Sequence, residues 1–556
     1  MSILDLRING QLSIENAKKI TLIQKNVQGE YTDFIANLID LNQLDELAWI
    51  LKVTTRNTYA SVIYDSMCRL ALLEDLLKNH VNISSIYLDR PSMKGPVIQL
   101  LSQHDRKIKI EIIGYKKTHH FIAITNLVKN FYISFNFWLM ARIVKNKDYS
   151  TEGIFLLDTF LFKNSFNNNS RYEDRYYPGL VDRLPNKISQ KTWFLATLSG
   201  FKHPLELYKI LVQIKRSRTK FLIKENWLNL NDYIFAIKKS ISLTKLIKLS
   251  PKWRNMDLFE IVSEENQSQQ GSHSISEPIL TYLAFNRFKL AGIKICGVVD
   301  WFENQVLDHG LYLGMRKNFP DTYIKGYLGF VPEEYYIGIY PTEYEYKAKM
   351  LPDELLVIGD IFVENMKRFK SDMKVLNAPA FRYKDVRDFE LKNNSLKDIV
   401  ILALPMKFDE AKRIIKMAAE TGFNNQYRWF IKIHPVTKLE KIIKLIPKSL
   451  IKNIVFIDQP LVNFFQETKL LVTSASSVAV DAAVCGIRVA IVGNISGPTI
   501  NRLSGIIDEN LWHVCYTSDD LQSQIIFDQD HNKVNKNLYF NPVTDKDCIN
   551  LMTFDK

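Results

Sequence analysis

The chain has 556 residues, more than a single hydrophobic core usually supports, so at least two domains are expected. Hydrophobic residues make up 46% and charged residues 24%, which excludes a disordered or fibrous protein. Lys and Arg number 73 against 60 Asp and Glu, an excess that suits a phosphate-bearing ligand or an anionic membrane surface. The five cysteines are widely spaced without a CxxC pair, which favours a reducing cytoplasm over a zinc site or a disulfide framework.

The sequence predicts neither a signal peptide nor a membrane-spanning helix. Acidic and basic residues occur from position 5 onward, which leaves no apolar stretch for a signal peptide. The most apolar segment, 121–143, holds an uncharged run of only 12 residues between Lys129 and Arg142. A spanning helix needs about 20 apolar residues. The sequence therefore predicts a protein that is soluble or that rests on a membrane without crossing it.

In the first part of the chain, short apolar runs predict two series of strands. The first series comprises 20–24, 49–53, 86–89 and 109–114, with a helix over 61–78. The second series comprises 155–162, 294–300, 323–330 and 355–359. Helical insertions are predicted at about 120–145 and 205–247, and the polar stretch 264–276 is predicted to be a loop.

In the later part of the chain, short apolar runs typical of strands alternate regularly with segments that have the periodicity of a helix. Strands are predicted at 398–405, 429–435, 453–460, 469–474 and 488–493. Helices are predicted between them at 409–422, 437–446, 461–467 and 477–485. This alternation predicts a parallel sheet with right-handed crossovers, and the nearly continuous apolar strands indicate helices on both faces.

The predicted fold class is therefore α/β, with two Rossmann-type, doubly wound lobes facing a central cleft. Residues 1–370 form an N-terminal lobe with the helical insertions, and 371–395 form a linker. Residues 396–540 form the C-terminal lobe, and 541–556 form a tail.

Three predicted strand ends carry polar side chains, and ligands of parallel sheets bind at such ends. The first reads IKIHP and ends in His434 and Pro435, with Lys432 two residues earlier on the same face. The second reads VTSASS and opens a helix with hydroxyls. The third, VDWFEN in the other lobe, ends in Asp300 and Glu303.

The two C-terminal motifs suit a phosphate. A helix N-terminus offers free N–H groups and a partial positive charge, to which Ser476 and Ser477 add hydroxyl donors. Ser474 is expected to cap the turn, His434 to donate a hydrogen bond, and Asp481 to orient the serine loop. The spacing alone leaves a structural alternative open, in which the serines only cap a helix and the histidine satisfies a buried carbonyl.

The IKIHP segment and TSASSVAVDAAVCGIRVAIVG resemble the nucleotide-binding lobe of GT-B glycosyltransferases that use CMP-sugars, such as bacterial sialyltransferases and Kdo transferases. Further segments, including WFENQVLDHGLYLGMRKNF, are similar to bacterial surface-carbohydrate biosynthesis proteins. The resemblance implies a GT-B fold, a cytidine-nucleotide donor and a lipopolysaccharide O-antigen or capsule product. It also implies nucleotide contacts by His434, Ser476 and Ser477. The sequence lacks the acidic Asp/Glu-Asp/Glu-Gly motif of the sialyltransferases, which leaves the donor sugar open.

Transfer to an acceptor hydroxyl needs a base, or a carboxylate nucleophile if configuration is retained. Glu303 is the first candidate and Asp300 the second, although Glu303 could instead cap a helix or pair with Arg316. Candidate contacts with sugar or acceptor are Asn304, Gln305, Arg56, Gly271 and Ser272, the last two in a loop that would close over the donor.

Two alternative functions stay open. CDP-glycerol and CDP-ribitol phosphotransferases share the His-Pro strand end and a Ser-Ser-x3-Asp helix start, and they carry a second histidine, for which His273 or His309 is available. The other alternative is a non-catalytic GT-B scaffold. No metal, cofactor or nucleic acid is predicted, because the sequence has no HExxH, P-loop, GxGxxG or Cys/His cluster.

Basic residues border an aromatic helix. Residues 101–150 contain nine Lys or Arg against three acids, around the helix with Phe131, Tyr132, Phe135, Phe137 and Trp138. A second basic cluster, 215–224, follows an amphipathic helix. This pattern suits an anionic leaflet and predicts peripheral association with the inner face of the cytoplasmic membrane, where a lipid-linked acceptor would lie. In the alternative, the aromatics fill the core and the charges are merely solvated.

Overall fold

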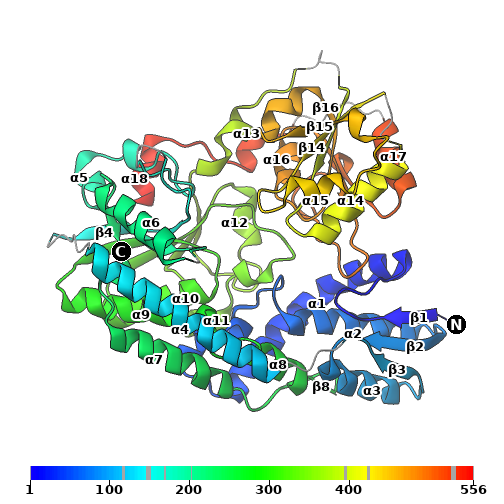
Figure 1. Cartoon of the computed structure of the whole chain (residues 1–556), viewed down its shortest axis with the longest axis horizontal. Coiled ribbons are helices and arrows are strands. Elements are labelled where there is room, and N and C mark those ends of the chain that lie inside the picture. The colour runs from blue at the N-terminus through cyan, green and yellow to red at the C-terminus, as the bar shows by residue number, and fades with distance from the viewer. Residues whose placement is uncertain are drawn as a thin grey trace.

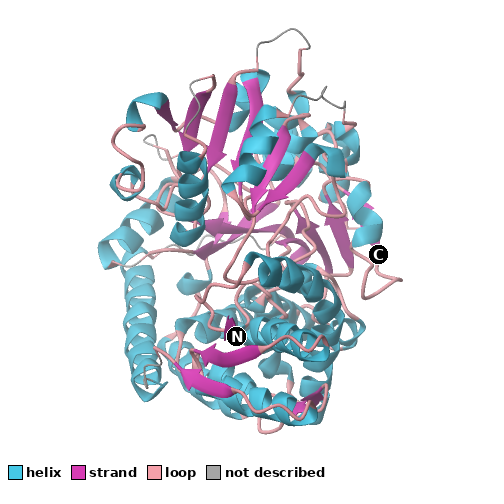
Figure 2. Ribbon diagram, turned by 90° about the vertical axis from the view of Figure 1, so that its right-hand side faces the viewer, coloured by secondary structure: helices cyan, strands magenta, loops and turns pink. Residues whose placement is uncertain are grey.

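The computed structural model describes residues 2–114, 119–145, 152–167, 171–201, 203–392, 397–422, 426–527 and 534–554. Within these ranges it contains three parallel sheets, of seven, six and three strands, and one antiparallel pair, β7 (Lys252–Trp253) with β8 (Met256–Asp257). The six-stranded sheet and its helices form the upper lobe in Figures 1 and 2. The predicted α/β class with two parallel-sheet lobes is confirmed.

The six-stranded sheet of the C-terminal lobe has the order β15-β14-β13-β16-β17-β18, and every neighbouring pair is parallel. Five of its strands coincide with the predicted ones, and β18 was not predicted. The strands are β13 (Ile399–Ala403), β14 (Arg428–Lys432), β15 (Ile454–Ile457), β16 (Thr468–Thr473), β17 (Arg488–Val492) and β18 (Trp512–Cys515).

Helices cover both faces of this sheet, as the continuous apolar strands indicated. Along β13, Val400 and Leu402 pack with Ile414 of α14 on one face, while Ile399 and Ile401 belong to the core on the other face. The helices of the lobe are α14 (Phe408–Glu420), α15 (Leu439–Ile443), α16 (Val478–Val484) and α17 (Ser518–Ile526). The doubly wound arrangement brings the carboxyl ends of β13, β14 and β16 to one edge.

The seven-stranded sheet has the order β12-β11-β10-β9-β4-β5-β6. The second predicted series coincides with β4, β9, β10 and β11, whereas β5, β6 and β12 were not predicted. The strands are β4 (Ile154–Leu161), β5 (Thr192–Leu198), β6 (Phe221–Leu222), β9 (Ile295–Trp301), β10 (Tyr323–Leu328), β11 (Glu354–Val357) and β12 (Val375–Asn377).

Long helices pack around this sheet, and three of them are the predicted insertions. α4 packs against α6, α7 and α9, and α9 packs in turn on α10. The helices are α4 (His119–Val144), α5 (Asn186–Ser189), α6 (Pro204–Arg216), α7 (Leu230–Ser242), α8 (Phe259–Gln267), α9 (His273–Leu290), α10 (Val306–Asn318), α11 (Glu343–Lys347) and α12 (Ile361–Asn365). No helix in the described ranges is long and apolar enough to cross a membrane.

A separate three-stranded parallel sheet, β1-β2-β3, begins the chain and lies at the lower right of Figure 1. Its elements are β1 (Ser2–Asp5), α1 (Ile14–Leu41), α2 (Val62–Lys78), β2 (Ile83–Leu88), α3 (Lys94–Gln103) and β3 (Lys109–Ile112). β2, β3 and α2 coincide with predicted elements. Within the described residues, the predicted first lobe therefore holds two separate parallel sheets in addition to the β7–β8 pair.

Two predicted strands of this region are wrong. Residues 20–24 lie inside α1, where Ile20, Val27, Tyr31 and Ile35 form a buried helical stripe. Residues 49–53 lie in two short 3-10 helices, Glu46–Ile50 and Lys52–Thr55. A five-residue apolar window cannot distinguish a strand from one turn of a buried helix, and the α1 stripe becomes visible only over the full 28 residues.

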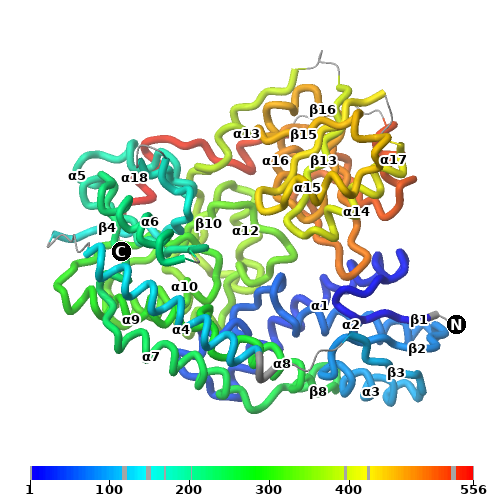
Figure 3. Tube along the Cα trace, viewed as in Figure 1, coloured from blue at the N-terminus to red at the C-terminus, as the bar shows by residue number. Residues whose placement is uncertain are grey.

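The predicted linker and tail both have regular structure. Part of the linker forms β12, and α13 (Lys384–Asp388) follows; the predicted boundary at 395–396 lies outside the described residues. In the tail, α18 (Asp545–Leu551) returns to the first lobe, as the red end of the trace in Figure 3 shows. There Lys325 Nζ donates to Asn550 O at 2.9 Å, and Phe554 stacks on Phe155.

Candidate functional site

A pocket of 340 Å³ lies at the carboxyl ends of β13, β14 and β16. Five residues that the sequence motifs singled out line it: Lys432, His434, Pro435, Ser476 and Asp481. The rest of the wall comes from the segment that joins the two lobes (Arg382, Asp385 and Val386), the ends of β13 and β14 (Ala403, Leu404 and Ile433), the segment after β15 (Pro460, Leu461, Val462 and Phe465) and the start of α16 (Val478). The structure thus brings the His-Pro and serine motifs to one cavity.

His434 is held in a tight turn immediately after β14. Its carbonyl accepts a hydrogen bond from Thr437 N at 2.8 Å, and its Nδ1 accepts one from Val436 N at 3.4 Å. A neutral imidazole that accepts at Nδ1 carries its proton on Nε2. The turn therefore prepares Nε2–H of this half-buried ring as a donor.

Lys432 does not offer a free ammonium to the pocket. Its Nζ donates to the carbonyl of Asp458 and to that of Gln459, the latter at 2.9 Å. These bonds tie the end of β14 to the loop after β15. The side chain lines the wall of the pocket as a structural cation.

The serine loop differs from the predicted capping arrangement. Ser474 is buried, and its hydroxyl donates to Glu410 of α14 at 2.6 Å, so it does not cap α16. Ser477 occupies the N-cap position of α16 without a side-chain cap bond, is exposed, and lies outside the pocket lining. The hydroxyl of Ser476, which does line the pocket, makes no hydrogen bond within the described part of the chain.

Asp481 and Arg382 form the opposite wall. Asp481 Oδ1 has no hydrogen-bond partner among the described residues, and burial raises the pKa of this carboxyl to about 7. The positive charge of Arg382 acts against that rise and holds the pKa lower than burial alone would. Arg382 lies in the linker, where no strand end or motif marked it, so the sequence analysis missed it.

Glu303 lies in the other lobe, directly after β9, close to Arg382. Its carboxylate accepts hydrogen bonds from Trp301 Nε1 at 3.0 Å and from Gln305 Nε2 at 2.9 Å. Burial raises the pKa of Glu303, while the Trp301 bond and the Arg382 charge lower it. Arg382 lies over the Trp301 ring at 5.6 Å and influences the carboxyls of Glu303 and Asp481, which places it between the two lobes.

Arg502 connects the serine loop to the first lobe. Its Nε donates to Ala475 O at 2.9 Å, its Nη1 pairs with Glu333 at 2.9 Å, and its Nη2 donates to the Tyr59 hydroxyl at 3.2 Å. The Tyr59 ring packs edge-on against Tyr336. Because the Tyr336 hydroxyl donates to the Glu303 carbonyl at 3.3 Å, a continuous series of contacts joins the predicted base to the serine loop.

Asp300 is not available as a catalytic group in this structure, because its exposed fraction is 0%. Its carboxylate accepts from the Tyr312 hydroxyl at 2.5 Å and lines an enclosed cavity of 20 Å³, about the size of one water molecule, with Asp158 and Asp308. Burial and the neighbouring carboxyls raise the pKa of Asp300 well above its usual range. The described residues contain no group of side chains arranged to hold a metal ion.

Arg56 and Asn304 belong to a closed internal network, which corrects their expected contact with a substrate. Both are fully buried. Arg56 pairs with Glu345 at 3.0 Å and donates to Tyr340 O at 2.7 Å, and Asn304 Nδ2 donates to the same carboxylate at 3.1 Å. His309 completes this network through Asn304 Oδ1. The alternative in which Glu303 pairs with Arg316 is not found, since Arg316 pairs with Asp353 at 2.9 Å.

The polar segment 264–276 is a helix–turn–helix connection rather than a loop over the donor. It contains the end of α8, the turn and the start of α9. Gly271 adopts a φ of +72°, its N–H donates to Ser240 O, and Asn130 of α4 donates to its carbonyl at 3.0 Å. Ser272 occupies the N-cap position of α9 without a side-chain cap bond, and its hydroxyl is hydrogen-bonded to the hydroxyl of Ser274 at 2.7 Å. These contacts fix the turn against α4 and α7, and neither residue lines the 340 Å³ pocket.

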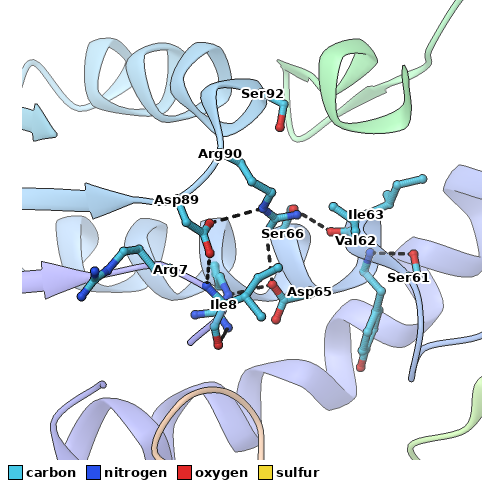
Figure 4. Close-up of polar contacts among 12 residues, drawn as sticks. Arg7, Ile8, Ser61, Val62, Ile63, Asp65, Ser66, Asp89, Arg90 and Ser92 are labelled. Carbon is cyan, nitrogen blue, oxygen red and sulfur yellow. Dashed lines mark hydrogen bonds and ion pairs between the residues drawn. The ribbon is translucent and has the colours of Figure 1, made fainter. Parts of the chain in front are cut away.

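A second charged cluster joins the small sheet to the C-terminal lobe. Figure 4 shows Arg90 between Asp89, with which it pairs at 3.5 Å, and Asp65, with which it pairs at 3.3 Å. Asp65 also accepts from Arg69 Nε at 2.8 Å, and Arg69 Nη2 donates to Ser496 O at 2.8 Å. The arginines and carboxylates neutralise each other, which indicates a structural attachment between sheets.

No family model and no curated protein matches this chain. It is similar in structure to several solved proteins. An S. aureus MnaA–UDP complex is 10% identical with a TM-score of 0.36, over 67% of this chain and 86% of that one. A UDP-N-acetylglucosamine 2-epimerase is 11% identical with a TM-score of 0.40, over 72% of this chain and 94% of that one. The calicheamicin glycosyltransferase CalG4 is 11% identical with a TM-score of 0.34, over 72% and 93%.

Proposed function

We propose that this protein is a GT-B-type glycosyltransferase of bacterial surface polysaccharide biosynthesis, of lipopolysaccharide O-antigen or capsule. It transfers a sugar from a cytidine-nucleotide donor, such as CMP-Kdo or another CMP-sugar, to a glycan or lipid-linked acceptor. The observation that supports this proposal best is the convergence of His434, Ser476, Asp481 and Arg382 on one pocket at the strand ends. The donor is a substrate, and neither a cofactor nor a metal is part of the proposal.

In this reaction the pocket binds the nucleotide and stabilises the leaving phosphate. Among the described residues, Nε2–H of His434 and the hydroxyl of Ser476 make no hydrogen bond, so both can donate to phosphate oxygens. Hydrogen bonds to a charged oxygen contribute about 1.5–3 kcal/mol each. The same donors stabilise the charge that develops as the bond between the anomeric carbon and the phosphate oxygen breaks.

Glu303 acts as the general base across the cleft. The acceptor oxygen forms the new bond to the anomeric carbon, its proton passes to Glu303, and the nucleotide monophosphate leaves with the electron pair of the broken bond. A raised pKa makes this carboxylate a stronger base than an exposed glutamate, and the hydrogen bonds from Trp301 and Gln305 fix its orientation.

The proposal is tested by measuring nucleotide release over CMP-Kdo, CMP-sialic acids and UDP-sugars, followed by equilibrium binding of CMP, CDP and UDP. His434→Ala should weaken CMP binding at least about tenfold, because one hydrogen bond to a charged oxygen is lost. His513→Ala is the matched control, since His513 is an exposed histidine on β18 of the same lobe and does not line the pocket. Binding of no cytidine nucleotide would refute the proposal and favour a non-catalytic scaffold.

A CDP-glycerol or CDP-ribitol phosphotransferase is the second candidate, because Ser476 and Asp481 of the Ser-Ser-x3-Asp pattern line the same pocket. The second histidine of such enzymes has no counterpart at this pocket. His309 is buried and bonded to Trp49 O and Asn304, and His273 is bonded to Glu277 and Asn130. Turnover of CDP-glycerol in the same screen would favour this candidate.

We also propose a peripheral location on the inner face of the cytoplasmic membrane, through the outer face of α4. Ile124, Val128, Phe131 and Phe135 recur at helical spacing on that face and are 42–63% exposed. The α4 sequence contains no acidic residue, and exposed Lys129 lies beside the stripe. Phe137 is instead buried, and Lys224 of the second basic cluster is buried against Glu277. Residues 116, 117 and 147 of the first basic cluster lie outside the described ranges.

A further inference from the structure

The pocket contains three side chains that can carry positive charge, Arg382, Lys432 and His434, but only one of them has an uncommitted cationic group. The Lys432 ammonium is bonded to two backbone carbonyls, and His434 accepts at Nδ1 as a neutral ring does. Within the described part of the chain, the Arg382 guanidinium makes no hydrogen bond and no ion pair. The guanidinium lies over the face of the Trp301 ring, 5.6 Å from its centroid.

The backbone that carries Arg382 is fixed on both sides. Phe381 is buried and packs against Tyr177 and Tyr327, with ring centroids 6.3 and 5.9 Å apart. Tyr383 stacks on Phe540 at 4.1 Å. Arg382 is therefore an exposed side chain between two buried aromatic residues, on the 3-10 turn Phe381–Tyr383. Such a setting positions the guanidinium without consuming its hydrogen-bonding capacity.

The groups around Arg382 are arranged for an anionic ligand that the protein does not itself supply. Asp481 has a buried, unpartnered oxygen on one side, and Glu303 lies on the other, yet neither is within ion-pair distance of the guanidinium. Ser476 in the same pocket has an unbonded hydroxyl. A phosphate seated between Arg382 and Ser476 would satisfy both, because a planar guanidinium binds phosphate oxygens through two parallel N–H donors.

We propose that Arg382 is the residue that binds the phosphate of the nucleotide. The inference rests on the proposed function and deepens it. It assigns the phosphate to a residue of the linker between the lobes rather than to Lys432, whose ammonium is bonded to two backbone carbonyls. Because Arg382 lies beside both Glu303 and the C-terminal pocket, phosphate binding there would also bring the donor to the cleft wall that holds the proposed base.

The test compares CMP with cytidine, which lacks the phosphate, by isothermal titration calorimetry of the full chain. Arg382→Ala should weaken CMP binding by at least about tenfold and leave cytidine binding unchanged, since a charged hydrogen bond contributes about 1.5–3 kcal/mol. Arg382→Lys should bind CMP with intermediate affinity, because the ammonium keeps the charge but not the bidentate geometry. Lys384→Ala is the matched control, as it removes a positive charge two residues away that pairs with Asp388 at 2.8 Å.

The outcomes separate the inference from the proposed function. If the wild type binds CMP and Arg382→Ala binds it equally tightly, the inference is overturned while the proposed function stands. If the wild type binds no cytidine nucleotide, both the inference and the proposed function are overturned. Equal losses of CMP and cytidine affinity would indicate a collapsed pocket and would also overturn a phosphate-specific role. Arg382→Lys tests independently whether the pocket has collapsed, because lysine preserves the packing over Trp301 better than alanine does. Intermediate CMP affinity with unchanged cytidine affinity in this variant would support the phosphate-specific role.

Discussion

The two lobes both place charged and polar residues just beyond a parallel strand, but they use them differently. After β9, Asn304 meets Arg56, which follows the 3-10 helix Lys52–Thr55, at the Glu345 carboxylate, and all three side chains are fully buried. After β14 and β16, His434 and Ser476 keep free donors beside an open cavity. The comparison teaches that a polar strand end indicates a ligand site only where the protein leaves hydrogen-bonding groups unsatisfied.

Of the two carboxylates predicted as catalytic at the end of β9, Glu303 is still a candidate and Asp300 is not. Substitution of Glu303 should therefore have the largest effect on the transfer rate. Glu303→Gln keeps the shape and the Trp301 contact but cannot accept a proton. Transfer by the variant should fall about 10²–10⁴-fold, the usual contribution of a general base, while CMP affinity stays unchanged. Single-turnover transfer rates and CMP titrations measure the two quantities separately.

The pH profile distinguishes a base from a merely structural carboxylate. Burial raises the pKa of Glu303 above its ordinary value, and the base works only when deprotonated, so kcat/KM should rise as pH increases through that raised pKa. Arg382→Ala removes a charge that lowers this pKa, so the rise should move to higher pH. Glu260→Gln, at an exposed position of α8, should leave the profile unaltered. Full transfer activity in Glu303→Gln would eliminate the proposed base.

Substitutions in the buried network of Arg56, Asn304 and Glu345 should lower the stability of the protein rather than its activity. Arg56→Ala leaves the Glu345 carboxylate buried and unpaired, and the free energy of unfolding should fall by about 3–5 kcal/mol. Urea unfolding followed by tryptophan fluorescence measures the loss. Arg382→Ala is the matched comparison, because that exposed arginine has no ion pair within the described residues and its removal should change stability little. Equal losses in the two variants would contradict the contrast drawn between the two strand ends.

Much of the C-terminal lobe could be predicted from sequence because its strands are short, continuous apolar runs separated by helical periodicity. β13 has this form, and the neighbouring strands β14 and β16 carry the His-Pro and serine motifs at their ends, on the expected edge. The first lobe was harder, since 20–24 has the composition of a strand but forms part of a 28-residue helix. Local windows carry too little information to separate those two structures.

A site residue could be predicted only where its own segment of sequence shows both the motif and the strand end that positions it. Arg382 was missed because its role depends on the linker passing over Trp301, a long-range contact that no local pattern encodes. Lys432 was predicted to face the nucleotide together with His434, because its spacing places both on one strand face. Its bonds to the loop after β15 depend on a neighbouring strand, so sequence spacing did not reveal them.

The smallest expected effects concern the exposed apolar face of α4, which differs from both strand ends because its side chains are hydrophobic. Phe131→Ser combined with Phe135→Ser should reduce binding to vesicles of phosphatidylcholine with 30 mol% phosphatidylglycerol. Both side chains are more than 40% exposed, so the substitutions remove little core packing. Lys129→Glu should weaken the same binding by about 1–2 kcal/mol, since each basic residue near an anionic surface contributes about 1 kcal/mol and the sign is reversed. Vesicle sedimentation measures both.

Ile526→Ser provides the matched control, because Ile526 is 60% exposed on α17 of the other lobe, remote from α4 in Figure 1. It should bind vesicles as the wild type does. Pure phosphatidylcholine vesicles should retain little protein, because the acid-free α4 then lacks its electrostatic attraction. Equal binding to neutral and anionic vesicles would contradict the charge argument. Loss of binding in Ile526→Ser as well would show that general surface hydrophobicity, rather than the α4 stripe, holds the protein on lipid.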